Sequence, residues 1–233
     1  MSLAEPEGEP FRFLGLDFDT KLAMGGCTRS LVHSASWKLK SILRTRRFFS
    51  DAEILQFFKC NIVSFLEYRT AGIYHAATTT LAPIDNLLNN LLRQIGMSRE
   101  HAATCCNMLP LYTRRDIAML GLIHRAILCL PPHHFWPFFR LDERDLRRTP
   151  RTVRHSKQLV ETPFRLAVVN RSCLGLIRIY NRLPQEAVDA QSVKAFQSRL
   201  TSYVLSHLRS GDPLWDHLFS PRLSIIRHPI YCI

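Results

Sequence analysis

Phe11-Arg-Phe-Leu-Gly-Leu-Asp-Phe-Asp19 is a short run in which hydrophobic and charged residues alternate around a glycine. This alternation is typical of a β-strand or of one half of a hairpin. Gly15 inside the run indicates a β-bulge or a close approach of two backbones. The run leads, through Gly25-Gly26, into a segment that is rich in cations. We therefore expect a short β element followed at once by a basic helix.

That helix is predicted over residues 28–47, where apolar side chains recur every three or four positions. Its C-terminal half carries the candidate nucleic-acid-binding residues of the chain, which are Lys38, Lys40, Arg44, Arg46 and Arg47. Cations at these positions also complement the helix dipole. Two interpretations stay open on spacing alone, namely contact with phosphates and a solvated helix face. Trp37 could likewise pack in the core or stack on a base or sugar.

Five more segments show helical periodicity or helix-capping signals, so the chain is predicted to be mainly α-helical. Ser50-Asp-Ala-Glu53 is a capping box, Gly96 is placed to end a helix, and Ser192 is placed to begin the last one. The segment after Thr113 is apolar on all sides, which predicts burial all round. The predicted helices span residues 50–68, 84–95, 98–106, 113–130 and 192–204.

The composition is that of a folded and strongly basic chain. The 233 residues are 46% hydrophobic and include 14 Phe, which is enough apolar material for a core. The net charge of +12 comes mostly from arginine, whose planar guanidinium suits phosphate. This charge predicts a polyanionic partner, above all nucleic acid. The alternative is a basic surface that only keeps the protein in solution.

The sequence also bears on the compartment. The seven cysteines are odd in number and include no C-x-x-C pair, so we expect inert thiols in a reducing environment. Residues 1–10 are acidic and rich in helix breakers, unlike a signal peptide, and are expected to be a disordered leader. No apolar run approaches the roughly 18 residues of a membrane span. The expected location is nuclear or cytoplasmic, with no membrane partner.

No residue pattern points to a self-sufficient enzyme. Asp17 and Asp19 would share one face of a strand, as paired magnesium ligands can, but a solvated strand edge is the favoured interpretation. His133-His134 has no third ligand at helical spacing, so a loop lodged in an aromatic core, residues 133–139, is favoured over a metal site. The sequence has no P-loop, G-x-G-x-x-G, G-x-S-x-G or H-E-x-x-H motif. We therefore expect no catalytic residue and no metal ligand.

Several motifs, taken in order, resemble the reverse transcriptases of non-LTR retrotransposons. The opening run is similar to the hairpin that closes the palm of those enzymes and positions the primer end, which makes Phe13, Leu14 and Gly15 primer-grip-like residues. The basic helix and the segments after it are similar to the thumb, although Arg69-Thr70 replaces the small residues usual there. The other segments that carry the resemblance are 50–76, 84–96, 109–116 and 192–197.

The resemblance implies a mainly α fold: a thumb-like helical bundle with a short N-terminal β-hairpin and a second helical layer. It implies a palm-edge hairpin over residues 11–26, a bundle over 27–112 and a C-terminal helical region over 113–233. Within that region, residues 140–157 are arginine-rich and are expected to form a mobile basic loop. The catalytic aspartates of the family precede the hairpin, and the sequence has no equivalent of them. We therefore expect the C-terminal part of an RNA-directed DNA polymerase.

The expected function is sequence-independent binding of template–primer nucleic acid, as RNA–DNA hybrid or duplex, through the basic helix. The missing palm and fingers would be a second partner. No cofactor is expected in this chain, although the intact family enzyme would use Mg, and we predict no polymerase turnover by the chain alone. The alternative is a helical scaffold for protein–protein contacts, suggested by the aromatic residues at 135–139. An exposed aromatic segment would favour the scaffold.

Overall fold

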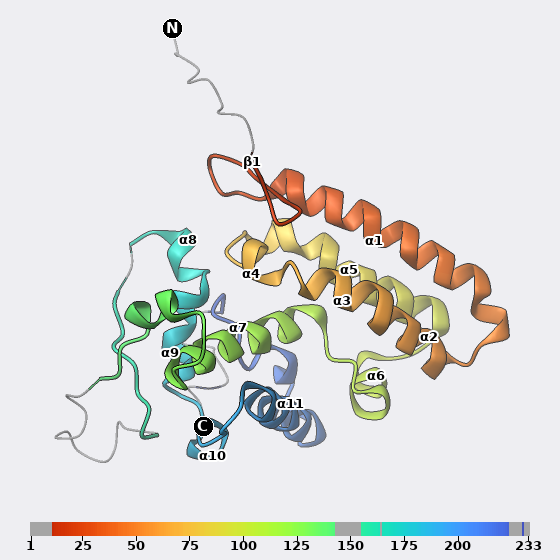
Figure 1. Ribbon diagram of the computed structural model, residues 1–233. Coiled ribbons are helices and arrows are strands. Elements are labelled where there is room, and N and C mark those ends of the chain that lie inside the picture. Colours follow the sequence, from red (N-terminus) through yellow and green to blue (C-terminus); the bar gives the residue numbers. More distant parts are fainter. Residues whose placement is uncertain (1–10, 143–154, 164, 224–229, 231–233) are drawn as a thin grey trace, which may run out of the picture. The chain divides into compact units, whose positions relative to one another are not determined.

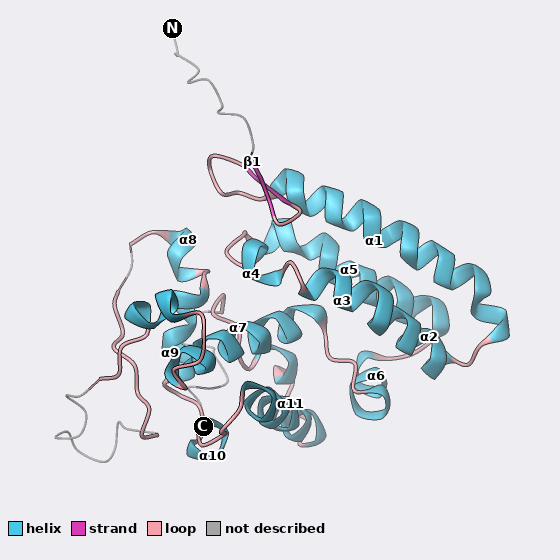
Figure 2. Cartoon of the chain, viewed as in Figure 1, coloured by secondary structure: helices cyan, strands magenta, loops and turns pink. Residues whose placement is uncertain are grey.

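The computed structural model describes residues 11–142, 155–163, 165–223 and 230. These residues are mainly helical, with eleven α-helices and a short two-stranded hairpin near the N-terminus, which confirms the predicted fold class (Figure 1, Figure 2). The chain divides into two compact units, residues 1–99 and 100–233. The expected leader, 1–10, and most of the expected basic loop, 143–154, lie outside the described residues. No helix in the described part is long and apolar enough to cross a membrane.

The opening run forms a hairpin of two antiparallel strands, β1 (Phe11–Phe13) and β2 (Leu16–Phe18). Two residues close it, Leu14 with φ 48° and Gly15 with φ 76°. Positive φ at both central positions is the geometry that two-residue hairpin loops favour, because it follows the right-handed twist of the strands. Gly15 therefore supplies a tight turn, and the expectation of a bulge at this glycine is wrong.

The hairpin packs on α4 (Thr70–Ile73) at a residue that has no side chain. A Cβ atom built on Gly72 would lie 2.3 Å from Cδ1 of Leu16 and 3.5 Å from Cζ of Phe18. Leu16 is buried in this contact, whereas its neighbours in the turn are exposed. The glycine at position 72 thus lets the apolar side of β2 lie directly against the helix backbone.

Asp19 joins the hairpin to the long helix α1 (Gly25–Thr45). Its carboxylate accepts hydrogen bonds from the backbone N–H of Ala23 at 2.8 Å and of Met24 at 2.6 Å. Met24 precedes α1, so the negative charge of Asp19 lies at the positive end of the helix dipole. This placement accounts for Asp19 as a structural residue.

The first unit continues with helices that lie beside α1 in Figure 1. They are α2 (Asp51–Phe58), α3 (Ser64–Glu67), the short α4, and α5 (Thr78–Ile95). A π-helical turn, Lys59–Val63, joins α2 to α3, and a 3₁₀ turn, Arg46–Phe48, follows α1. The apolar faces of α1, α2 and α5 meet in a common core, as their helical periodicity predicts.

The predicted caps of this unit are confirmed. Ser50 and Glu53 form a reciprocal capping box at the start of α2. Gly96 ends α5 in the left-handed conformation, with φ 69°. The helix begins at Thr78, earlier than the predicted residue 84, and Pro83 is its sixth residue. Pro83 lacks the N–H that would donate to the carbonyl of Thr79, so the helix continues through the proline with one backbone hydrogen bond fewer.

The second unit contains α6 (Arg99–Cys106), whose first residue still belongs to the first unit, and two long helices, α7 (Leu111–Ile127) and α11 (Val193–Arg209). Short helices lie between them in the sequence: α8 (Ala167–Asn170), α9 (Ile177–Tyr180) and α10 (Gln185–Val188). The helix α7 starts two residues before Thr113, so the expected boundary after residue 112 falls inside it. Ser192 caps α11 by accepting from Ala195 N–H at 3.2 Å, as predicted.

The predicted all-round burial of α7 holds for much of the helix, including Ile117, Met119, Leu120 and Ile123. It packs against α11. At this contact a Cβ on Gly121 would lie 2.4 Å from the amide nitrogen of Gln197. A glycine therefore sets how closely the two helices approach.

The aromatic segment 133–139 differs from its prediction. It forms a 3₁₀ turn, His133–Phe138, in which the two histidines are exposed and Phe138 keeps 58% of its surface exposed. Only Phe139 is buried. The peptide bond between Pro131 and Pro132, just before the turn, is cis. The expectation of a loop lodged in an aromatic core is therefore wrong for most of the segment.

A buried polar network centred on Tyr180 joins distant parts of the second unit. The ring of His124 stacks on Phe196 at 4.1 Å, and its two nitrogens lie 2.9 Å from Tyr180 Oη and from Ala190 O. His155 Nε2 lies 2.9 Å from the carbonyl oxygen of Tyr180. Both histidines are almost completely buried, and burial lowers the pKa of each imidazole.

Candidate nucleic-acid interface

The exposed side of α1 is cationic and aromatic along most of its length. At 3.6 residues per turn, one side of the helix carries the buried residues Leu31, Ala35 and Leu39. We call the opposite side the outer stripe, and it consists of Arg29, His33, Trp37, Lys40 and Arg44, all exposed. The helix contains no carboxylate. The outer stripe is therefore a run of positive charge with an aromatic ring at its centre.

Trp37 lies in solvent and not in the core, with 55% of its surface exposed. Its Nε1–H donates to Nε2 of His33 at 3.1 Å, and Nζ of Lys40 lies 5.1 Å from the centre of its ring. Neighbours on both sides thus hold the indole ring in place. A rigid, exposed indole flanked by cations is the arrangement on which a nucleobase can stack while its phosphates meet the cations.

The other predicted contacts on α1 separate into two groups. Arg44 is exposed and has no hydrogen bond or ion pair with any described residue, so its guanidinium is free to bind a phosphate. Lys38 points to the flank of the helix. Its Nζ lies 4.0 Å from the ring centre of Phe65 and 3.5 Å from the carbonyl oxygen of Asn61, so it already has partners inside the unit.

Arg46 and Arg47 lie beyond the end of α1, in the 3₁₀ turn. Arg46 donates from Nη1 to the carbonyl of Gln94 at 3.2 Å, near the C-terminus of α5, where the helix dipole is negative. Arg47 lies over the exposed ring of Phe48, with 4.7 Å between the guanidinium carbon and the ring centre. Of the two, Arg47 keeps more of its donors directed to solvent.

The primer-grip-like residues lie at the opposite end of α1. Phe13 and Leu14 expose 59% and 66% of their surfaces at the tip of the hairpin, and Gly15 forms its turn. The 21 residues of α1 correspond to about 30 Å of helix. The predicted site residues therefore do not form one cluster. The hairpin residues lie at one end of an extended surface, Lys38 and Lys40 lie beside Trp37, and the arginines lie at the other end.

Sequence reasoning missed Arg29 and His33. Both lie upstream of the predicted basic segment and carry no local charge pattern. The available signal is their spacing, because Arg29, His33 and Trp37 follow one another at four-residue intervals and so share one helix face. Following the face of Trp37 toward the N-terminus of the predicted helix would have found them.

The residues considered as metal ligands have structural contacts instead. Asp17 pairs with Arg12 at 3.8 Å across the hairpin, and Asp19 caps α1. The rings of His133 and His134 contact neighbouring aromatic rings. Among the residues that the structure describes, no group of three or more His, Cys, Asp or Glu side chains could hold a metal ion.

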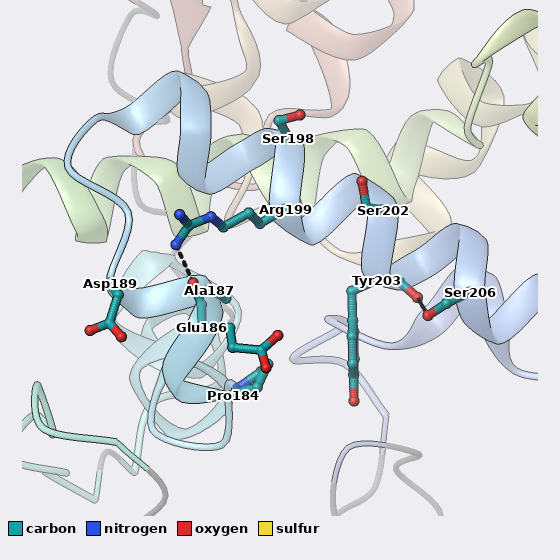
Figure 3. A pocket seen from close by; sticks show the side chains of 9 residues that line it. All are labelled: Pro184, Glu186, Ala187, Asp189, Ser198, Arg199, Ser202, Tyr203 and Ser206. Atoms are coloured by element: carbon teal, nitrogen blue, oxygen red, sulfur yellow. Dashed lines mark hydrogen bonds between the residues drawn. The ribbon is translucent and has the colours of Figure 1, made fainter.

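A groove in the second unit, between α10 and α11, has a volume of about 690 Å³ (Figure 3). Three serines of α11 line it in a row, at successive turns of the helix. Its charged lining residues are Glu186, Asp189 and Arg199, and Arg199 donates to the carbonyl of Glu186. The lining includes neither His nor Cys, so the groove contains no pairing of a nucleophile with an imidazole base.

Comparison with known proteins adds no identification. No protein-family model, curated protein or solved structure matches the chain. The chemistry of the surfaces described above is therefore the basis for a functional proposal.

Proposed function

We propose that residues 11–99 bind nucleic acid through its sugar–phosphate backbone, without base specificity, along the outer stripe of α1. The observation that carries this proposal is the exposed Trp37, fixed between His33 and Lys40 on a helix that has cations and no carboxylate. Cations supply affinity for any sequence because every nucleotide carries a phosphate. An aromatic ring adds stacking that is equally tolerant of sequence.

The length of the surface supports a helical partner. From Arg29 to Arg44 the outer stripe is about 22 Å long, which equals the rise of six to seven base pairs, so a duplex or hybrid could follow it. The hairpin tip, Phe13 and Leu14, lies at the N-terminal end of the same helix. In the reverse-transcriptase interpretation, this tip would contact the primer end, and the helices would be the thumb of the polymerase.

That interpretation rests on the order of the sequence motifs together with the hairpin-to-basic-helix connection. It makes the bound species a template–primer RNA–DNA hybrid or duplex. It assigns the chemistry of nucleotide addition to catalytic aspartates in a palm outside this chain, which would be a second partner. No residue of this chain is proposed to be catalytic.

Reversing the charge of the two cations at the C-terminal end of the outer stripe tests the proposal. We expect Lys40→Glu/Arg44→Glu to weaken binding of an RNA–DNA hybrid by at least about tenfold near 0.1 M salt, because two phosphate contacts are lost. The slope of log affinity against log salt concentration should become shallower by about two. Fluorescence anisotropy with a labelled hybrid at several salt concentrations measures both quantities.

The matched control is Lys194→Glu/Arg209→Glu. These two cations are exposed on α11 in the second unit, so the control makes the same change in net charge at another place. Affinity and slope should stay near those of the unmodified protein. Equal losses in both double variants would contradict the proposal, because they would show a response to overall charge only.

Replacing Trp37 separates stacking from charge. We expect Trp37→Ala to weaken binding of single-stranded RNA by about fivefold to a hundredfold, since an aromatic–base contact is worth about 1–3 kcal/mol. The salt slope should stay unchanged, because no phosphate contact is lost. Trp37→Phe, which keeps a ring, should recover much of the affinity. A weaker salt slope in Trp37→Ala, or full affinity, would rule out a stacking role.

The partly exposed aromatic segment favours a second candidate, the protein-interaction scaffold. Phe138 is 58% exposed, and nearby Leu130 and Leu141 are 39% and 52% exposed. Exposed apolar side chains that gather in one patch are typical of protein-binding surfaces, and these three lie within twelve residues of one another in the sequence. The hybrid titration discriminates the two candidates: absent or salt-insensitive binding would remove the first and leave the scaffold.

A further inference from the structure

The first unit has a groove between α1 and α5, and two residues of the outer stripe, Arg29 and His33, belong to its lining. Its volume is about 690 Å³. Gly25, at the start of α1, and Thr79, at the start of α5, both line it, so the two helices begin at the same end of the groove. The unpaired backbone N–H groups of a helix start carry partial positive charge, and here two such starts are adjacent.

The charge of the groove is positive. Arg29 lines it and forms no hydrogen bond or ion pair with any described residue. The lining contains no carboxylate. Asp19 offsets part of the charge at the start of α1 through its bonds to Ala23 and Met24. The start of α5 has no side-chain cap. Thr80 N–H donates to the carbonyl of Ala77, so the N–H groups of Thr78 and Thr79 are the ones left for an anion.

His33 adds a directed donor at the rim. The indole N–H of Trp37 can only donate, so Nε2 of His33 must be the acceptor of their 3.1 Å hydrogen bond. In the neutral ring the proton then lies on Nδ1, which has no partner among the described residues. The outer stripe thus fixes the tautomer of a residue that lines the groove, leaving one N–H free to donate to a ligand.

The remaining polar lining consists of hydroxyl groups. Thr28, Ser36, Thr79 and Thr80 all line the groove. Thr28 is 2% exposed, and its hydroxyl oxygen has no hydrogen-bond partner among the described residues, although such buried groups are normally paired. Pro83 has no N–H, so it cannot donate to the carbonyl of Thr79 in the helix. The groove is therefore lined by hydroxyl groups and by a helix start at which the carbonyl of Thr79 lacks its usual donor.

We propose that this groove binds a sugar phosphate. The phosphate would lie at the start of α5, held by Arg29 and the Thr79 and Thr80 hydroxyls, and a sugar hydroxyl would donate to the Thr79 carbonyl. The ionised oxygens of a phosphate group accept hydrogen bonds but cannot donate them. A sugar phosphate adds hydroxyl groups that donate, so it can also bond to a carbonyl oxygen. The same chemistry has two sources, a free sugar phosphate and the 5′-phosphorylated end of a nucleic acid. Binding of the free compound does not depend on the proposed function of the outer stripe.

Ribose 5-phosphate is the first probe. In protein labelled with ¹⁵N-tryptophan, the Nε1–H resonance of Trp37 reports on the groove through its hydrogen bond to His33, and Trp37→Phe identifies it among the three indole signals. We expect a saturable shift with half-saturation at about 1 mM or below. Ribose without the phosphate should cause no shift. Failure of ribose 5-phosphate to saturate, or an equal response to ribose, would overturn the proposal.

Arg29→Gln tests the residue that carries the charge, and we expect it to weaken ribose 5-phosphate binding at least tenfold. Arg93→Gln is the matched control, because this exposed arginine lies at the other end of α5 and should change binding less than twofold. Equal losses in the two variants would overturn the proposal.

Thr79→Val/Thr80→Val removes two hydroxyl groups and keeps the shape of the side chains nearly constant. It should weaken ribose 5-phosphate binding several-fold, and unchanged binding would contradict the proposed position of the phosphate.

Two oligonucleotides then distinguish the sources. Single strands of identical sequence, one with a 5′-phosphate and one with a 5′-hydroxyl, are compared by anisotropy. A higher affinity for the phosphorylated strand that disappears in Arg29→Gln identifies a nucleic-acid end as the ligand. Equal affinity for both strands, together with saturable ribose 5-phosphate binding, identifies a free sugar phosphate. Either result supports the groove as a binding site. If ribose 5-phosphate does not bind, the proposal is wrong whatever the oligonucleotides show.

Discussion

Lowering the pH from 7.5 to 5.5 is expected to destabilise the second unit. The carbonyl of Ala190 can only accept, so Nε2 of His124 carries the proton and Nδ1 accepts from the hydroxyl of Tyr180. His155 is held in the same way, with Nε2 donating to the Tyr180 carbonyl and Nδ1 accepting from Lys157 N–H at 3.2 Å. A second proton on either ring would remove the acceptor that its neighbour needs.

The sign of the effect follows from where the protons bind. Burial lowers the pKa of both histidines in the folded chain, whereas in the unfolded chain they titrate near 6.5. Below about pH 6.5 the unfolded state takes up protons that the folded state does not. The free energy of unfolding therefore falls as the pH falls, by up to about 1.4 kcal/mol per pH unit for each histidine, until the folded pKa is reached.

Urea unfolding of a Trp37→Phe/Trp136→Phe background measures this effect. The chain has three tryptophans, and this background leaves only Trp215, which is buried in the second unit. His124→Gln keeps one donor and one acceptor but cannot gain a proton, so it should remove about half of the pH dependence. His134→Gln, at an exposed position, should leave it unchanged. A free energy of unfolding that is flat or rises between pH 7.5 and 5.5 would contradict the expectation.

Gly175→Ala should be the most damaging single substitution in the same unit. A Cβ at this position would lie 1.9 Å from the carbonyl oxygen of Asn170 and 2.6 Å from its carbonyl carbon. These are backbone atoms of α8, which cannot rotate away as a side chain can. The buried residues Leu176 and Ile177 follow directly, so the clash would displace core side chains. We expect the free energy of unfolding to fall by about 3 kcal/mol or more.

Gly121→Ala is the control for size alone. Its Cβ would meet only the amide end of Gln197, a side chain that can move, so the expected loss is smaller, about 1 kcal/mol. Both variants are measured by the Trp215 signal in the same background. Equal stability of the Gly175→Ala and Gly121→Ala proteins would contradict the prediction. It would show that the backbone between α8 and the 3₁₀ turn Cys173–Leu176 can shift to accommodate the methyl group.

Local signals in the sequence predicted the helices well. The Ser50–Glu53 capping box, the Gly96 C-cap and the Ser192 N-cap all occur as expected, because a cap is decided by residues within three or four positions of it. The helical spacing also predicted which side of α1 is buried. It could not decide whether Trp37 faces solvent, because an amphipathic pattern tolerates an aromatic residue on either side of its border.

Contacts between distant residues were beyond prediction. His124 meets Tyr180 and Ala190 across 56 and 66 residues, and a lone histidine in an apolar helix gives no sign of such partners. The aromatic segment 133–139 was expected to be buried on composition alone, yet it follows a cis proline bond and remains mostly exposed. The groove between α1 and α5 likewise arises from two segments about 50 residues apart, neither of which carries a recognisable binding motif.

Asp19 has a mechanical consequence. Its bonds to the N–H groups before α1, with Leu16 packed on Gly72, fasten the helix at its N-terminal end. The hydrogen bond from Arg46 to the carbonyl of Gln94 fastens the other end, and the helix packs on α5 between the two. The exposed cations therefore stand on a rod about 30 Å long whose two ends are both held, so a ligand that contacts them has to match their spacing.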